Sequence, residues 1–561
     1  MRNADIFKED NYEFNYEFSG RFFVVNKIVN PIIPGFYPDP SICRVGDDFY
    51  LVCSSFELYP GIPVFHSKDL AHWEQLCYAM TKENGFHMEA NMFCGGVMAP
   101  TIRYHKGTFY IVNANFAHKG NFIVTAKDPA GPWSEPKWLD EVPDIDCSIF
   151  FDDDKVYLVA PGMAENEDNN RGIFVSEFDL ESGRLIGERK QIWNSAARNA
   201  ASPEAPHIYH IGDYYYLMIA EGGTEHYHAV TIARSKDIFG WYEGNPANPV
   251  MTHRHMGFNY PIDNVGHADF VDTPDGNWYA VMLGSRIIEG QHKNLGRETY
   301  ICPVLWERDW PIFSPGTGKI EFEYPADEKL PWTPYPKKPA RDNFDSDTLD
   351  LDWSFWGTPY EDFWKIENGK LTLKCLDRPI VRELHGFLVG KWEIKEDDCV
   401  SFMGKRQIQP DFKAGCQMHF VPENGEAAGM IIMQASNHQY RVEKHLKDGK
   451  SVLDLILVTT DFNGLPFLPN YSAETTETVL VSVDCPQDDI VIMIQAKGQD
   501  TTVFYGADET NLQTLYAHAD CGLINPEKVG GMVGTMIGVY ATANGAQSDN
   551  QAEFDWFELE Q

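Results

Sequence analysis

The stretch GDDFYLVCSSF at residues 46–56 decides the fold, because four variants of it follow in the first half of the chain. In each variant a polar turn leads into an apolar run with a tyrosine near its start. The variants are KGTFYIVNANF (106–116), DDKVYLVAPGM (153–163), GDYYYLMIAEG (212–222) and DGNWYAVMLGS (275–285). Short apolar and aromatic runs bounded by turn residues are typical of β-strands. The repetition predicts five units of one strand-rich design.

A second phrase follows four of these stretches and contains a strand, a polar turn and often a tryptophan, as in VFHSKDLAHWEQL (64–76). Successive repeated tyrosines lie 47–63 residues apart, which is enough for a four-stranded antiparallel blade with its loops. The repeats therefore predict a five-bladed β-propeller. A long β-sandwich with chance similarity between its strands is the alternative, but the two phrases keep their order through most units, which favours the propeller.

The character of the sequence changes after Ile320. Five prolines between Pro325 and Pro339 indicate a stiff, extended connector. Beyond them come short strands such as VLDLILV (452–458), which at close spacing are typical of a β-sandwich. Helical periodicity is hard to find, so the predicted fold class is all-β. The predicted segments are an N-terminal extension at 1–25, a propeller at 26–324, a proline-rich linker at 325–340 and a β-sandwich at 341–561.

The composition excludes several classes of partner. The chain has 46 Lys and Arg against 83 Asp and Glu, a formal charge of −37, so it would repel nucleic acid and anionic membrane surfaces. No apolar run approaches the roughly 18 residues of a membrane span, and the first 20 residues are too polar for a signal peptide. We therefore expect a soluble, cytoplasmic protein. A homo-oligomer is compatible with the sequence, which does not fix the oligomeric state.

The eleven cysteines contain no CxxC pair, so neither a disulfide framework nor a zinc site follows. Nothing in the sequence indicates an organic cofactor.

The innermost strand of each propeller blade lines the central axis. The residue one turn upstream of each repeated tyrosine, 11 or 12 positions earlier, should therefore face this axis. Those positions hold Asp39, Ala99, Asp146, Glu204 and His267. Each carboxylate alone is more simply interpreted as a turn residue. Three at matched positions suit glycoside hydrolysis, in which one carboxyl protonates the leaving oxygen and another acts as base or nucleophile.

Several stretches, among them FYPDPS, resemble glycoside hydrolase family 43 in its β-xylosidase and α-L-arabinofuranosidase branches. The resemblance covers nearly the whole chain, and its matching segments are 30–73, 202–235, 264–281, 294–313 and 340–356, the last opening the accessory β-sandwich. It implies an exo-acting, inverting glycosidase that releases terminal xylose or arabinofuranose from xylo- and arabino-oligosaccharides. A non-catalytic sugar-binding or interaction propeller is the rival interpretation, and the presence of both a candidate acid and a candidate base argues against it.

The resemblance also implies individual roles. It places the general base at Asp39, the general acid at Glu204 and a carboxylate that raises the pKa of the acid at Asp146. The candidate substrate-binding residues are Phe56, Met98, Ala99 and Arg297, and His267 is expected to contact a calcium ion in the propeller channel. A segment of the sandwich near Met532 is the candidate cap of the pocket.

Some of these assignments have alternatives. Arg297 could form a salt bridge between blades, and His267 could be a buried core histidine. Met98 stands where the xylosidase branch usually has tryptophan. A flexible methionine defines a sugar face less rigidly than an indole, so the sequence does not rank xylose against arabinose.

Overall fold

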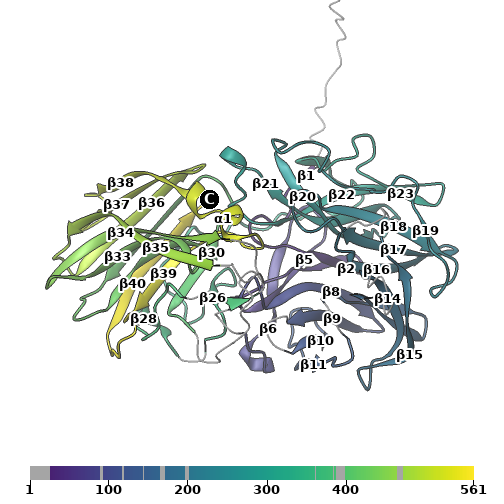
Figure 1. Ribbon diagram of the computed structural model, residues 1–561, viewed down its shortest axis with the longest axis horizontal. Helices are drawn as coiled ribbons and strands as arrows, with labels where there is room; N and C mark the ends of the chain where they lie inside the picture. Colours follow the sequence, from purple (N-terminus) through teal and green to yellow (C-terminus); the bar gives the residue numbers. More distant parts are fainter. Residues whose placement is uncertain are drawn as a thin grey trace, which may run out of the picture.

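The computed structural model describes residues 26–88, 92–115, 119–142, 145–163, 171–195, 201–359, 362–382, 385–386, 399–463 and 472–561. The predicted extension at 1–25 lies outside these residues. Nearly all of the regular structure is β-strand, arranged in a propeller and a sandwich that lie side by side (Figure 1).

Five four-stranded antiparallel sheets form the blades of the propeller. Blade 1 consists of β2 (Ser41–Val45), β3 (Asp48–Val52), β5 (Gly61–Ser67) and β6 (Glu74–Met80). Blade 2 consists of β8 (Val97–His105), β9 (Thr108–Asn115), β10 (Gly120–Ala126) and β11 (Lys137–Trp138). Blade 3 consists of β12 (Ser148–Asp152), β13 (Lys155–Met163), β14 (Arg171–Asp179) and β15 (Arg184–Trp193).

Blade 4 consists of β16 (Glu204–Ile211), β17 (Tyr214–Glu221), β18 (Ala229–Ser235) and β19 (Glu243–Gly244). Blade 5 consists of β20 (Ile262–Asp272), β21 (Trp278–Arg286), β22 (Glu298–Glu307) and β23 (Trp310–Phe313). The first strand of each blade is innermost, and every repeated tyrosine lies on the second strand. Both features confirm the prediction of a five-bladed propeller.

The innermost strands β2, β8, β12, β16 and β20 contact one another in ring order, and β20 closes the ring against β2. The two ends of the propeller chain meet where β1 (Lys27–Val29) pairs with β24 (Glu323–Pro325). Next to β1, the Asn30 amide donates hydrogen bonds to the carbonyl oxygens of Ile301 and Glu321, at 2.8 and 2.9 Å. These contacts hold blade 5 to the start of the chain.

Apolar side chains fill the spaces between successive blades. For example, Met218 of blade 4 and Phe270 of blade 5 belong to one buried cluster. Because both faces of a blade are covered by its neighbours, its strands are apolar on both faces rather than on one, which is what the repeated tyrosine stretches show.

The sandwich packs two sheets face to face around one large core that includes Ile492, Phe554, Met430 and Val539. The first sheet runs β27 (Trp364–Glu367), β28 (Lys370–Lys374), β40 (Gln551–Glu560), β31 (Phe412–His419), β36 (Asp489–Lys497), β37 (Asp500–Gly506) and β38 (Gln513–Asp520), with β25 (Arg341–Asp342) also on β40. The second runs β35 (Ser472–Asp484), β34 (Lys450–Asn463), β33 (His438–Lys447), β32 (Ala427–Ala435), β39 (Met536–Thr542), β30 (Phe402–Arg406), β26 (Ser354–Trp356) and β4 (Leu58–Tyr59).

Strand β4 belongs to the propeller chain, between β3 and β5, yet it pairs with β26 at the edge of the sandwich. Short elements complete the description: η1 (Lys82–Asn84), η2 (Glu289–Gln291), η4 (Cys521–Ile524), α1 (Pro526–Val529) and the parallel pair β7 (Met92–Phe93) with β29 (His385–Gly386). Residues 326–340, all described, form neither strand nor helix. Within the described part of the chain, no helix is long and apolar enough to cross a membrane.

Candidate active site

All eight site residues predicted from the sequence line one pocket at the propeller axis. They are Asp39, Phe56, Met98, Ala99, Asp146, Glu204, His267 and Arg297. Met532 of the sandwich also lines this pocket, which confirms that the predicted segment of the second domain reaches it.

The same local backbone brings these residues to the axis in every blade. Asp39, Ala99, Asp146 and His267 have φ values of 55°, 46°, 57° and 51°, a left-handed conformation that costs a non-glycine residue about 1–3 kcal/mol. In blade 4 the residue with this conformation is Ala205, at 48°, directly after Glu204. Each of the five blades therefore has one strained residue at the matching position near the axis, and such clustered strain is typical of a functional site.

Asp39 is the best-connected carboxylate of the pocket, and its side chain is only 6 % exposed. Its oxygens accept hydrogen bonds from the Ser54 hydroxyl at 2.6 Å and from Nη1 of Arg297 at 3.1 Å. Burial by itself would raise the pKa of this carboxyl, but the surrounding groups, of which the Arg297 charge is the strongest, together lower the pKa below its ordinary value. Asp39 is therefore ionised at neutral pH.

The Ser54 hydroxyl has a fixed orientation, since its oxygen also accepts a hydrogen bond from the backbone N–H of Ala99 at 2.6 Å. Its proton is thus directed at Asp39. No sequence pattern singles out Ser54, because its role depends on a contact between blades 1 and 2.

Asp146 and Glu204 come from the two blades opposite. Asp146 is buried and precedes β12, while Glu204 is partly exposed and begins β16. Both line the same pocket as Asp39, so carboxylates from blades 1, 3 and 4 face one space.

Arg297 connects several walls of the pocket. Besides its bond to Asp39, its Nη1 donates to Thr224 Oγ1 at 2.6 Å, and its guanidinium lies 5.3 Å from the centre of the Phe56 ring. Its Nε and Nη2 are buried and have no hydrogen-bond partner among the described residues. Thr224, which the sequence analysis missed, follows the Gly222–Gly223 turn, where only the fold shows what it contacts.

The apolar walls come from both domains. The Phe56 ring stacks on Phe36, with ring centres 5.5 Å apart, and both belong to a buried cluster with Met98 and with residues of the sandwich. The sandwich therefore fixes the position of Phe56 against the pocket.

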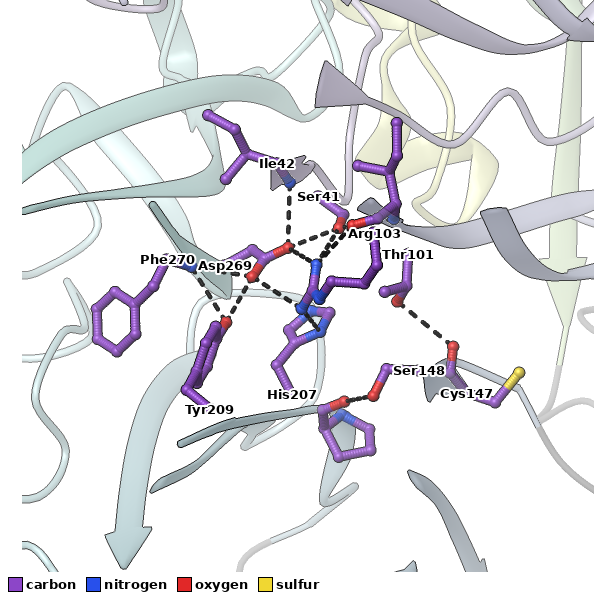
Figure 2. Close-up of polar contacts among 12 residues, drawn as sticks. Ser41, Ile42, Thr101, Arg103, Cys147, Ser148, His207, Tyr209, Asp269 and Phe270 are labelled. Carbon is purple, nitrogen blue, oxygen red and sulfur yellow. Dashed lines mark hydrogen bonds and ion pairs between the residues drawn. The ribbon is translucent and has the colours of Figure 1, made fainter. Parts of the chain in front are cut away.

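One layer deeper along the same inner strands, a buried polar network fills the axis (Figure 2). Arg103 of β8 donates to both oxygens of Asp269 on β20, at 2.8 and 3.2 Å, and to Nδ1 of His207 on β16, at 3.0 Å. Asp269 also accepts hydrogen bonds from Ser41 of β2 and from Tyr209. The pocket thus has a floor, so it suits the end of a sugar chain and not a chain passing through.

His267 is the residue that could contact a metal. Its Nδ1 is 3.7 Å from Asp39 Oδ1, and burial lowers its pKa, so the imidazole is neutral and offers a lone pair. The described residues contain no group of three or more His, Cys, Asp or Glu side chains that could hold a metal. Calcium prefers six to eight oxygen ligands. The residues present therefore fit only an ion that takes one nitrogen from His267 and keeps most of its water.

Comparison with known proteins agrees with this geometry. The family model "Glycosyl hydrolases family 43" matches residues 28–311, and the model "Beta xylosidase C-terminal Concanavalin A-like domain" matches 341–560. The chain belongs to glycosyl hydrolases family 43. A xylosidase/arabinosidase of Butyrivibrio fibrisolvens is 41% identical over 545 residues, which cover 95% of this chain and 99% of the relative. A non-reducing end α-L-arabinofuranosidase of Bacteroides ovatus is 37% identical, covering 94% of each chain.

Solved structures of family 43 proteins share the whole architecture. A Bacteroides ovatus protein named for a xyloglucan locus superposes with a TM-score of 0.82 at 36% identity, and a xylan β-1,4-xylosidase from Bacillus halodurans with 0.82 at 28%. Each match covers 95% of this chain and 100% of the other. This family 43 chain is thus a glycosidase with the complete two-domain arrangement, and the non-catalytic interpretation is not favoured.

Proposed function

We propose that the protein is an exo-acting, inverting glycosidase that releases terminal xylose and arabinofuranose from xylo- and arabino-oligosaccharides. One observation carries this proposal: a pocket with a closed floor gathers carboxylates from three blades. The names of the two similar family 43 relatives support the choice of pentose substrates.

In the proposed reaction Asp39 is the general base. Its lowered pKa keeps it ionised, and it would accept a proton from water as the water oxygen bonds to the anomeric carbon. Glu204 would donate a proton to the leaving oxygen as the glycosidic bond breaks. Asp146 would favour the protonated form of Glu204 through like charge and would orient the sugar. One water is consumed, and one proton enters and one leaves the enzyme.

The remaining pocket residues would bind the terminal sugar. Phe56 supplies an apolar face, Met98 and Ala99 extend the wall beside it, and the unpaired Nε and Nη2 of Arg297 are donors suited to sugar hydroxyls. Because Met98 is flexible, this wall should accept both pyranose and furanose rings.

Glu204→Ala tests the role of the acid. We expect turnover of xylobiose to fall by about 10²–10⁴-fold, the usual contribution of general acid catalysis. An aryl glycoside with a good leaving group should keep more of its rate, because its departure needs less protonation. Equal losses on both substrates would contradict the assignment of Glu204 as the acid.

We also propose His267 as the single side-chain ligand of a hydrated calcium ion, whose positive charge would help to keep Asp39 ionised. Such a site would be weak, so chelation should remove the ion and lower the melting temperature, and millimolar calcium should restore it. His267→Ala should abolish the calcium response. An unchanged melting temperature in chelator would leave His267 as a buried core histidine.

A further inference from the structure

One buried asparagine ties the loop that carries Arg297 to the sandwich. The loop joins β21 to β22 in blade 5, and Arg297 is its last residue. Asn294, three positions earlier, is only 3% exposed. Its side chain and its backbone carbonyl together make five hydrogen bonds to the sandwich. The other domain therefore helps to set the position of this propeller loop.

Both ends of the Asn294 side-chain amide are bonded. Its Nδ2 donates to the carbonyl oxygen of Cys521 in η4 at 3.0 Å, and its Oδ1 accepts a hydrogen bond from Nε2 of Gln499, between β36 and β37, at 2.8 Å. The Cys521 carbonyl can only accept, so it fixes which end of the amide faces it. An aspartate could keep the contact with Gln499 but not the contact with Cys521.

The backbone carbonyl oxygen of Asn294 is bonded to two further residues of the sandwich. It accepts hydrogen bonds from the backbone N–H and the Oγ1 hydroxyl of Thr535, both at 2.9 Å, and from Nε2 of Gln434 on β32 at 2.8 Å. Thr535 follows Met532, the sandwich residue in the pocket wall, in the same segment. These contacts thus hold together the two chain segments that carry Arg297 and Met532.

The turn that precedes Arg297 also packs closely against the sandwich. The N–H of Gly296 donates to the carbonyl oxygen of Lys293 at 2.7 Å, and Gly296 has a φ of 78°. A Cβ atom at Gly296 would lie only 2.7 Å from the carbonyl oxygen of Val533. The backbone of the turn therefore lies directly against the backbone of the sandwich, and the hydrogen bonds of Asn294 keep it there.

Arg297 depends on a fixed loop because its contacts come from different blades. Its Nη1 donates to Asp39 of blade 1 at 3.1 Å and to Thr224 of blade 4 at 2.6 Å. Hydrogen bonds of the N–H···O type in proteins are roughly 2.7–3.2 Å long, so the contact with Asp39 tolerates little movement of the loop away from it. Its guanidinium must also stay beside the Phe56 ring, 5.3 Å from the ring centre.

We propose that Asn294 is a positioning residue, through which the sandwich holds Arg297 against Asp39 and the terminal sugar. The inference rests on the proposed function, because it uses the proposed role of Arg297 in binding that sugar. Asn294 is not one of the described residues that line the pocket, so its effect on the reaction would be exerted through Arg297.

The test is a double-mutant cycle between Asn294 and Arg297. Asn294→Ala removes both side-chain hydrogen bonds, and kcat/KM on nitrophenyl β-xyloside should fall about tenfold, less than the roughly 10²-fold cost of a full ångström of misplacement. In an Arg297→Gln background the same substitution should change kcat/KM less than twofold, because the guanidinium to be positioned is gone. A merely structural loss would lower kcat/KM by the same factor in both backgrounds.

A second variant approaches the same contact from the sandwich. Gln499→Ala removes the hydrogen bond to Asn294 Oδ1, so it should lower kcat/KM in the same direction but less than Asn294→Ala, and again only when Arg297 is present. This variant decides the question if Asn294→Ala does not fold.

Asn248→Ala is the matched control, because the Asn248 amide also makes two side-chain hydrogen bonds, to the N–H and the carbonyl oxygen of Ile232 at 2.9 and 2.8 Å within blade 4. It should lower the melting temperature, as Asn294→Ala should, while kcat/KM stays within twofold of the wild type.

The outcomes separate this inference from the proposed function. If Arg297→Gln lowers kcat/KM, but Asn294→Ala and Gln499→Ala have no effect or the same effect in both backgrounds, Asn294 is not a positioning residue and the proposed function stands. If Arg297→Gln leaves kcat/KM unchanged, the role of Arg297 is wrong and this inference fails with it. If the wild type hydrolyses neither nitrophenyl β-xyloside nor nitrophenyl α-arabinofuranoside, the proposed function itself fails.

Discussion

At the scale of single residues, the charge on Arg297 sets the state of Asp39. Arg297→Gln removes that charge while keeping an amide of similar polarity, so the pKa of Asp39 should rise. The ionised form of Asp39 predominates above its pKa and is lost as the pH falls through that pKa. The acid limb of kcat/KM against pH should therefore move to higher pH in the variant.

Thr224→Val is the matched control for this experiment, because it removes the other hydrogen-bond partner of Arg297 Nη1 without changing any charge. Its acid limb should stay where the wild-type limb lies, even if KM changes. An unmoved acid limb in Arg297→Gln would show that Asp39 is not the titrating base.

The residues that could be predicted without the family resemblance are those whose positions repeat from blade to blade. Asp39, Asp146 and Glu204 could be found by counting from the tyrosines, because each blade repeats one spacing and one left-handed residue. Ser54 and Thr224 could not, since each acts through a hydrogen bond to another blade. Because the blades are separate segments of the sequence, local sequence patterns do not predict contacts between them.

At the scale of elements, the segment from Phe56 to β4 joins the pocket to the sandwich. Glu57, in the middle of it, is 7% exposed, and its Oε2 has no partner among the described residues. Burial raises the pKa of this carboxyl to about 8. Between about pH 4.5 and 8 the folded protein therefore holds a proton that the unfolded chain releases, so folding stability falls as the pH rises through this range.

Glu57→Gln should remove this dependence, because an amide is neutral throughout. The melting temperature of the variant should exceed that of the wild type at pH 8, and the difference should shrink towards pH 5, with a slope of up to about 1.4 kcal/mol per pH unit in stability. Glu181→Gln, at an exposed position, should show no such trend. A constant difference at all pH values would mean that Glu57 does not titrate in this range.

Strand β4 also marks the limit of prediction for elements. The blades could be predicted because each contains long apolar strands at a regular spacing. β4 has two residues and pairs with β26, which is far away in the sequence. Neither a hydrophobic period nor a turn motif therefore predicts this strand. Its pairing depends on the edge of a sheet in another domain, which local sequence does not encode.

At the scale of the whole molecule, the pocket depends on both domains. The propeller supplies the carboxylates, the polar network on its axis closes the floor (Figure 2), and the sandwich contributes Met532 and holds Phe56 through their shared apolar cluster. The sequence predicted both domains from their different strand patterns, and the segment near Met532 only from resemblance. A cavity lined by Lys293 of the propeller and Glu527 of the sandwich could not be predicted, because it exists only where the two domains meet.

The arrangement of blades also predicts the stereochemistry of the reaction. Asp39 comes from blade 1 and Glu204 from blade 4, on different sides of the propeller axis. An inverting mechanism requires carboxyl groups roughly 6.5–9.5 Å apart, so that a water fits between the base and the sugar, whereas a retaining pair is only about 5 Å apart. Placement across the axis favours the wider separation, so Asp39 would deprotonate water and never bond to the sugar. Proton NMR of a β-xyloside digest should therefore show α-xylose first, before mutarotation mixes the anomers. If β-xylose is released first, Asp39 is a nucleophile, and the roles assigned to both carboxylates are wrong.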